Sequence, residues 1–271
     1  MVSGRGDAAA PIGVFDSGLG GLTVAHAIMR RLPHESLVYF GDTARVPYGP
    51  KSPDTVRRYS REIAHFLLEQ GVKAIVVACN TATAHALPAL REELDVPVLG
   101  VVEPGARAAV QASRSGRIGV IATEGTIRSG AYARAIHHVA PDADVTALAC
   151  PLFVPLVEEG WTDHEAAYLI AHEYLDPITR AGVDTLVLGC THYPLLKRLI
   201  GEVVGRPMRL IDSAEETAAD TARMLDELGL ATTSDDASYR FIASDDPQQF
   251  LSLGQRFLGD VIERVEIHSL G

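Results

Sequence analysis

The fold is decided by a segment that occurs twice. Gly71–Thr81 reads GVKAIVVACNT, and Gly182–His192 reads GVDTLVLGCTH. In both copies Gly-Val opens an apolar run, and a cysteine follows eight residues after the glycine, where the run turns polar. Short continuous apolar runs are typical of parallel strands that are covered on both faces. Each copy therefore predicts a buried strand with a thiol, Cys79 or Cys190, at its carboxyl end.

The surrounding sequence repeats in the same order. Ile12-Gly13-Val14 recurs 106 residues later as Ile118-Gly119-Val120, and Val46-Pro47 recurs 108 residues later as Val154-Pro155. The two cysteines are 111 residues apart. Three landmarks at a nearly constant offset indicate a duplicated unit, much longer than the repeat of a solenoid.

Short apolar runs alternate with amphipathic ones along the chain. A helix is predicted from the capping Ser52 and the Pro53 that follows it, and a second over Ala214–Leu228. The predicted strands are Ile12–Phe15, Ser36–Phe40, Ala74–Ala78, Val98–Val102, Ile118–Ala122, Val145–Ala149 and Thr185–Gly189. This alternation predicts an α/β fold with two pseudo-symmetric, doubly wound domains and mostly parallel sheets.

We assign residues 1–102 and 213–271 to the first domain, with Cys79, and residues 103–212 to the second, with Cys190. Open α/β sheets bind ligands beyond the carboxyl ends of their strands, and clefts between domains are preferred sites for small molecules. Both thiols are therefore expected to face an active site in the interdomain cleft.

Composition narrows the class of protein. The 271 residues are 47% hydrophobic and carry a formal net charge of −11, which argues against a nucleic-acid or anionic-membrane partner. The first ten residues lack the apolar stretch of a secretory signal, and no apolar run reaches the length of a membrane span. Three cysteines, an odd number, favour reduced thiols over a disulfide framework. We expect a cytoplasmic protein.

The two thiols are the candidate acid/base groups. Cys79 and Cys190 are each expected to open a helix after a strand, where the helix N-terminus lowers the pKa of a thiol. The free N–H groups there, with the side chains of Asn80, Thr81 and Thr191, are suited to bind a substrate carboxylate. His192, two residues after Cys190, is expected to take part as a nucleophile's partner or a proton relay.

Asp16 and Ser17 lie in the segment DSGLGG that follows the first predicted strand. The dinucleotide-binding fingerprint needs glycine where Thr23 stands, so this segment predicts a tight turn that holds Asp16 and Ser17 at the cleft. The repeat has Ala122 in place of Asp16, so the fold itself does not demand a carboxylate. Cys150 has no thiol counterpart and is assigned to the core. No spacing typical of a metal site accompanies the cysteines, so no metal and no cofactor are predicted.

Four motifs closely resemble those of the bacterial glutamate racemases, within the aspartate/glutamate racemase family. They are DSGLGG from Asp16, FGDTARVPYG from Phe40, ACNTA from Ala78 and LGCTHYP from Leu188. The resemblance extends from about Ile12 to Ile211. It implies an isomerase that interconverts L- and D-glutamate without a cofactor and supplies D-glutamate for peptidoglycan synthesis.

The resemblance also implies roles for individual residues. Cys79 would be the acid/base thiol for the D isomer and Cys190 the one for the L isomer, assisted by Asp16 and His192 respectively. Glu158 matches a catalytic glutamate near the cleft. The residues that would hold the substrate are Asp16, Ser17, Tyr48, Gly49, Asn80, Thr81, Thr191 and His192.

Several alternatives stay open on the sequence alone. The same pair of thiols could racemise aspartate or another amino acid, and a two-domain protein could bind an amino acid without chemistry. Binding alone has no need of two thiols, and a dithiol redox protein requires sulfurs close enough to bridge. The oligomeric state is open as well, with a homodimer as one possibility.

Overall fold

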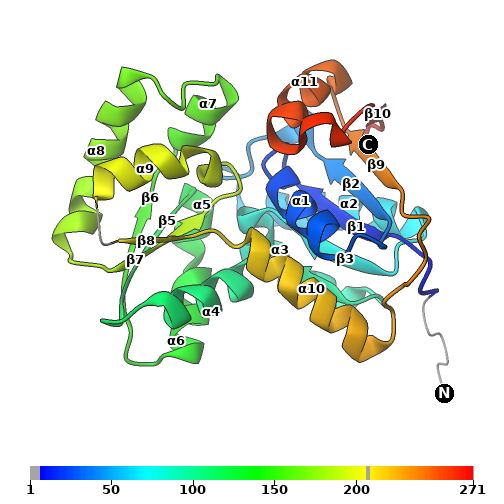
Figure 1. Cartoon of the computed structure of the whole chain (residues 1–271), viewed down its shortest axis with the longest axis horizontal. Helices are drawn as coiled ribbons and strands as arrows, with labels where there is room; N and C mark the ends of the chain where they lie inside the picture. Colours follow the sequence, from blue (N-terminus) through cyan, green and yellow to red (C-terminus); the bar gives the residue numbers. More distant parts are fainter. Residues whose placement is uncertain (1–6, 206–207, 271) are drawn as a thin grey trace.

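The computed structural model describes residues 7–205 and 208–270 of the chain. These residues form two parallel β-sheets, which lie in separate halves of the molecule with helices around each (Figure 1). The first sheet has the strand order β10-β9-β2-β1-β3-β4, and the second has the order β6-β5-β7-β8. The strand pairings in both sheets are parallel.

The strands of the first sheet are β1 (Ile12–Asp16), β2 (Leu37–Gly41), β3 (Ala74–Val77), β4 (Val98–Gly100), β9 (Tyr239–Ala243) and β10 (Glu266–Ile267). Those of the second are β5 (Arg117–Ala122), β6 (Asp144–Ala149), β7 (Thr185–Gly189) and β8 (Arg209–Ile211). The helices are α1 (Leu22–Arg31), α2 (Pro53–Glu69), α3 (Asn80–Glu93), α4 (Val102–Ala112), α5 (Glu124–Ser129), α6 (Ala131–Val139), α7 (Phe153–Glu158), α8 (Glu165–Arg180), α9 (Lys197–Val204), α10 (Ala214–Leu228) and α11 (Pro247–Leu258). Three 3₁₀ turns complete the described elements: η1 (Thr43–Arg45), η2 (Tyr193–Leu196) and η3 (Gly259–Val261).

The central strands of each sheet are buried on both faces, as the continuous apolar runs predict. In β1, Ile12 and Val14 pack into one core cluster, while Phe15 packs into another on the opposite face. In β5, Val120 and Ile121 divide in the same way between two clusters. Side chains that alternate between two apolar layers explain why these strands read as unbroken hydrophobic sequence.

The duplication predicted from the sequence is visible in the topology. The order β2-β1-β3-β4 in the first sheet repeats as β6-β5-β7-β8 in the second. The residue after β2 donates its backbone N–H to the last residue of β1, from Asp42 to Asp16 at 3.1 Å. The residue after β6 does the same at β5, from Cys150 to Ala122 at 2.9 Å. The predicted fold class, two pseudo-symmetric α/β units with parallel sheets, is confirmed.

The C-terminal part of the chain completes the first sheet. After β8 the chain enters α10, whose Ala218 and Leu225 pack in the same cluster as Leu22 of α1. β9 then pairs with β2, over Leu37 to Gly41. The residues at which we divide the chain into domains, after 102 and before 213, stay a prediction.

One predicted strand ends earlier than expected, and three observed strands had no predicted counterpart. The strand expected over Val98–Val102 ends at Gly100, because Val102 already begins α4. Strands β8, β9 and β10 were not predicted at all. Among the described residues, no helix is both long and apolar enough to cross a membrane.

Candidate functional site

The turn after β1 brings a carboxylate to the boundary between the two halves. Asp16 is fully buried, and its Oδ2 accepts the backbone N–H of Gly18 at 2.9 Å. Its Oδ1 accepts the hydroxyl of Thr191, from the second half, at 3.4 Å. Burial raises the pKa of Asp16, and the positive charge of His192 opposes that shift. The turn that was predicted to hold Asp16 and Ser17 in place is present.

Cys79 caps the N-terminus of α3 and is 5% exposed. Its sulfur accepts the N–H of Ala82 at 3.4 Å and lies 3.7 Å from the hydroxyl of Ser17. Burial and the neighbouring Asp16 carboxylate raise the pKa of the Cys79 thiol to about 12. The expectation that the helix N-terminus lowers this pKa is therefore wrong: the Ala82 N–H does act in that direction, but desolvation outweighs it.

Cys190 follows β7 directly and is 6% exposed. The prediction that it opens a helix is wrong, since tight turns and the 3₁₀ turn η2 follow it, and α9 begins only at Lys197. The turn is closed by the backbone N–H of Tyr193, which donates to the carbonyl of Cys190 at 3.1 Å. It nevertheless places Nδ1 of His192 3.9 Å from the Cys190 sulfur.

His192 lies between that sulfur and a carboxylate. Nε2 of its buried ring is 3.2 Å from Oε1 of Glu158, which is at the end of α7 and 38% exposed. The N–H does not point well at this oxygen, so the contact is an ion pair and not an aligned hydrogen bond. Burial alone lowers the pKa of His192, but Cys190 and Glu158 together raise it to about 10.

One cavity between the two halves carries both thiols. It is tight, leaving about 20 Å³ in which the centre of a water molecule can move, which is room for about one water. The residues that line it are Ser17, Val46, Pro47, Tyr48, Gly49, Cys79, Asn80, Thr81, Thr123, Val154, Cys190, Thr191 and His192. Of the predicted site residues, only Asp16 and Glu158 do not line this cavity. They contact it through Thr191 and His192 respectively.

A buried carboxylate behind the cavity fixes the segment that bears Tyr48 and Gly49. Asp42 accepts hydrogen bonds from the Tyr48 phenol and the Arg45 guanidinium, and from the Ser244 hydroxyl at 3.0 Å. In the sequence, Asp42 is noticeable only as part of the motif FGDTARVPYG and as the counterpart of Cys150 in the repeat. Its position just after a buried strand was the available signal.

Contacts across the cavity hold the halves together. The Thr81 hydroxyl lies 2.9 Å from that of Thr123, and both lie within hydrogen-bond distance of the Thr126 hydroxyl. The backbone N–H of Gly125 donates to the carbonyl of Gly49 at 2.9 Å. Thr123 was missed by sequence reasoning, although it directly follows the strand that repeats β1. The cavity is thus enclosed from both sides by residues at the carboxyl ends of strands.

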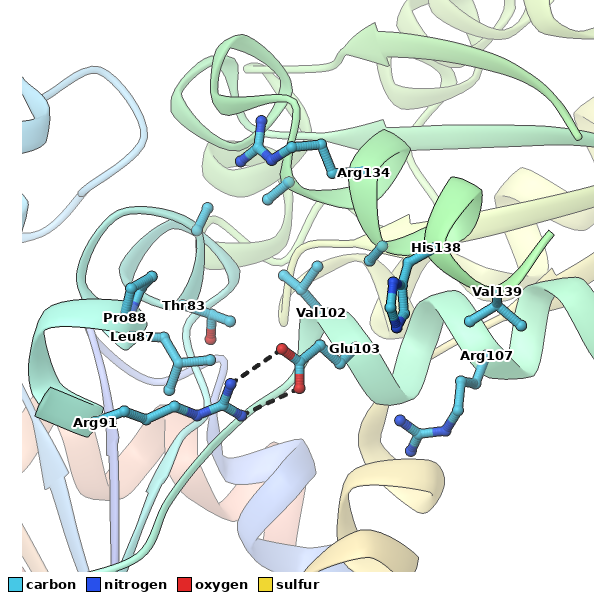
Figure 2. A pocket seen from close by; sticks show the side chains of 13 residues that line it. Thr83, Leu87, Pro88, Arg91, Val102, Glu103, Arg107, Arg134, His138 and Val139 are labelled. Atoms are coloured by element: carbon cyan, nitrogen blue, oxygen red, sulfur yellow. Dashed lines mark hydrogen bonds and ion pairs between the residues drawn. The ribbon is translucent and has the colours of Figure 1, made fainter. Parts of the chain in front are cut away.

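A larger cavity lies between α3, α4 and α6 and contains no thiol (Figure 2). Its volume on the same measure is about 810 Å³. Beside it, Arg91 and Glu103 form a bidentate ion pair (Figure 2). Arg107, Arg134 and His138 also line it. None of the predicted site residues does. The larger of the two cavities is therefore not the one that is lined by the two thiols.

Within the described ranges, 7–205 and 208–270, no group of three or more His, Cys, Asp or Glu side chains is placed to hold a metal ion. All three cysteines are free, and Cys150 is fully buried in the core of the second half. The titratable side chains in and beside the cavity include two thiols, one imidazole and two carboxylates.

Thiols on opposite halves of one cavity can take a proton from one side of a carbon atom and return one from the other. Fold and site together point to an α/β isomerase. The chain belongs to the Asp/Glu/hydantoin racemase family, whose sequence model matches residues 22–221.

Individual relatives agree with this membership. The chain is 60% identical to a glutamate racemase of Geobacter metallireducens over 250 residues, 92% of each chain. It superposes with a TM-score of 0.91 on the glutamate racemase of Francisella tularensis in complex with D-glutamate, at 40% identity over 97% of this chain and 98% of that one. The Thermus thermophilus glutamate racemase in complex with β-chloro-D-alanine is 52% identical, with a TM-score of 0.88 over 97% and 98% of the two chains. The family resemblance read from the four sequence motifs is confirmed.

Proposed function

We propose that this chain is a glutamate racemase, an isomerase that interconverts L- and D-glutamate by proton transfer at Cα, with Cys79 and Cys190 as its two acid/base groups and no cofactor. The observation that carries the proposal is the pair of free thiols that line one cavity from opposite halves. The relatives named as glutamate racemases, at identities up to 60% over most of the chain, support glutamate as the substrate.

The two thiols differ in a way that suits a reaction with one base and one acid. The raised pKa of Cys79 keeps it a neutral thiol, able to deliver a proton. The imidazolium of His192, 3.9 Å from the Cys190 sulfur, is placed to stabilise a thiolate there. In this state Cys190 removes the α-proton of L-glutamate and Cys79 protonates the opposite face, which yields D-glutamate. The reverse reaction starts with the two protonation states exchanged.

The α-proton of an amino acid is too weakly acidic for a free thiolate to remove quickly. Donors around the substrate carboxylate must therefore stabilise the negative charge as it develops. Asn80, Thr81 and Thr191 line the cavity beside the thiols and supply such donors. Tyr48, Gly49 and Ser17 complete the enclosure, and exclusion of bulk water strengthens every one of these interactions.

Charged groups at the edge of the cavity act on the groups that line it. Asp16 adds to burial in raising the pKa of Cys79, and Cys190 with Glu158 raises the pKa of His192. We assign Asp16 and Glu158 as groups that act through Cys79 and His192. The D-glutamate formed would serve peptidoglycan synthesis in the cytoplasm, where reduced thiols persist. We further propose that the protein forms a homodimer. Sedimentation velocity should then give the mass of two chains, and the mass of one chain would refute this.

The test is a substrate comparison under reducing conditions, with no cofactor added. Optical rotation should fall toward zero for L-glutamate and for D-glutamate at similar rates, whereas L-aspartate should lose its rotation at least about 100-fold more slowly, since a site that fits the longer side chain leaves the shorter one badly placed. Faster loss of rotation with L-aspartate would identify an aspartate racemase. Tight binding of glutamate without loss of rotation would identify a binding protein.

A further inference from the structure

Tyr132 is a buried tyrosine that joins the two halves and has so far no role in the site. It lies near the start of α6, is 3% exposed, and its ring packs in the core of the second half with Val120, Ile136 and Val187. Its hydroxyl reaches across to the first half and donates to Oδ1 of Asn80 at 2.7 Å. Asn80 is the first residue of α3 and is 3% exposed.

Only one of the two polar atoms of the Asn80 side-chain amide has a hydrogen-bond partner within the described part of the chain. Its oxygen accepts from Tyr132, but its Nδ2 is buried and has no hydrogen-bond partner among the residues that the structure describes. A buried N–H donor without a partner is unfavourable, so such a group in a folded protein calls for an explanation. Asn80 lines the cavity that holds both thiols, which makes its NH₂ group a donor available to an acceptor bound there.

The direction of the Tyr132 hydrogen bond follows from its surroundings. Burial raises the pKa of the phenol well above its ordinary value, so the hydroxyl keeps its proton. An amide oxygen can only accept a hydrogen bond, so the phenol is the donor to Oδ1 of Asn80.

Close packing leaves this arrangement little freedom. A Cβ atom on Gly105 of α4 would lie 3.1 Å from Cβ of Ser213 and 3.3 Å from the Tyr132 hydroxyl. Glycine at this position lets the three elements that carry Gly105, Tyr132 and Ser213 approach each other. The phenol is therefore held in place by packing and not only by its hydrogen bonds.

We propose that Tyr132 is a positioning residue for substrate binding. It holds the amide of Asn80 so that the NH₂ group, and not the oxygen, faces the cavity and donates to the carboxylate of the substrate. Tyr132 and Asn80 belong to opposite halves. The Asn80 NH₂ group is therefore oriented by Tyr132 only while the halves are closed on each other. The proposal rests on the proposed function in one respect, that the ligand is an amino-acid carboxylate.

The kinetic test uses Tyr132→Phe, which removes the hydroxyl and keeps the buried ring. Without the hydroxyl the Asn80 amide can turn its oxygen toward the carboxylate, so KM for both L- and D-glutamate should rise by about 10-fold, with kcat changed by less than about threefold. Asn80→Ala should raise KM at least as much. If Tyr132 acts through Asn80, adding Tyr132→Phe to Asn80→Ala should raise KM no further.

The matched control is Tyr174→Phe, at a half-buried tyrosine of the second half. Its hydroxyl accepts the backbone N–H of Leu152 at 3.4 Å, away from the cavity, so its removal should leave KM unchanged. An unchanged KM in Tyr132→Phe would overturn the proposal. So would a rise in KM that is as large in the Asn80→Ala background as in the wild type.

A second readout does not depend on turnover. The side-chain NH₂ signals of Asn80, identified as the pair missing from the NMR spectrum of Asn80→Ala, should move in Tyr132→Phe and stay in place in Tyr174→Phe. If the wild-type protein failed to racemise glutamate, the proposed function would fall while these signals would still decide whether Tyr132 orients the amide. Signals that do not move in Tyr132→Phe would contradict the positioning role in either case.

Discussion

Cys79 and Cys190 occupy the same place in the duplicated unit, but their surroundings have diverged. Cys79 has the Ala82 N–H, the Ser17 hydroxyl and the Asp16 carboxylate near it. Cys190 has the imidazole of His192, which Glu158 contacts from its other side. A site that only binds a substrate would not need different surroundings for its two thiols. Proton transfer from one face of a carbon atom to the other needs one acid and one base at a time.

Replacing either thiol by a hydroxyl tests the two-base assignment. Cys79→Ser and Cys190→Ser should each lower the rate of racemisation at least about 100-fold, because a serine hydroxyl is a far weaker acid than a thiol and does not supply a base at neutral pH. Circular dichroism of glutamate follows the rate. Cys150→Ser makes the same atomic change in the core, and should lower the melting temperature while leaving kcat intact. Wild-type turnover in Cys79→Ser or Cys190→Ser would refute the assignment.

The charge on His192 gives a prediction about pH. With its pKa raised to about 10, His192 should be an imidazolium at pH 8, and Glu158→Gln should lower its NMR titration midpoint. The folded-state pKa lies above the ordinary value of about 6.5, so the stability it contributes is fully present below about pH 6.5 and is lost as the pH rises through about 10. Unfolding of wild type and His192→Gln at several pH values measures that contribution. A wild-type midpoint below pH 7 would contradict this account.

Most cavity residues could be named from the sequence because they follow the carboxyl ends of recognisable strands. The raised pKa of Cys79 could not be predicted from the sequence, since it depends on burial and on Asp16, which lies 63 positions away in the sequence. Thr123 and Asp42 also sit directly after strands. They were passed over because a single Thr or Asp in such a place is ordinary turn chemistry until its partners are known.

The turn after β1 lies in close contact with the second half. A Cβ atom on Gly20 would collide with the Thr191 hydroxyl and would lie 2.6 Å from Nδ1 of His192. Only glycine lets this turn approach the second half so closely. The approach also aligns Asp16 with Thr191.

Gly20→Ala should therefore lower kcat/KM at least about 10-fold while the protein still folds, because a displacement of about 1 Å at a site can cost that much or more. The control is Gly201→Ala in α9, where the added Cβ makes only an ordinary contact with Leu210 at 3.6 Å. That change should keep activity and raise stability by about 0.5–1 kcal/mol through helix propensity. Equal activity in the two variants would show that the turn does not need its close approach.

Elements with strong local signals were predictable from the sequence. α2 begins after the capping Ser52, whose side chain accepts the N–H of Thr55 at 3.2 Å, and α10 spans the predicted residues. β9 was not predictable in this way, because its partner β2 lies about 200 residues earlier and only that pairing makes it a strand. β8 and β10 are three and two residues long, too short to show a period.

At the scale of the molecule, the cavity is closed on both sides by contacts between the halves. With room for about one water, it must open to admit an amino acid and close again around it. The contacts that would break and re-form include the Thr81–Thr123 contact, the Gly125–Gly49 hydrogen bond and the Tyr132–Asn80 hydrogen bond. Closure holds each thiol on its own side of the substrate, so that the two thiols do not share a proton.

The central claim, two separate thiols acting on one carbon, is tested most directly by isotope content. L-Glutamate is incubated with the protein in D₂O, the reaction is stopped early, the enantiomers are separated and deuterium at Cα is measured in each. The D-glutamate formed should carry deuterium almost completely, because its proton comes from a thiol that has exchanged with solvent, while the remaining L-glutamate should keep its original hydrogen. Deuterium entering the remaining L-glutamate as fast as D-glutamate forms, or D-glutamate that keeps the original hydrogen, would contradict the claim.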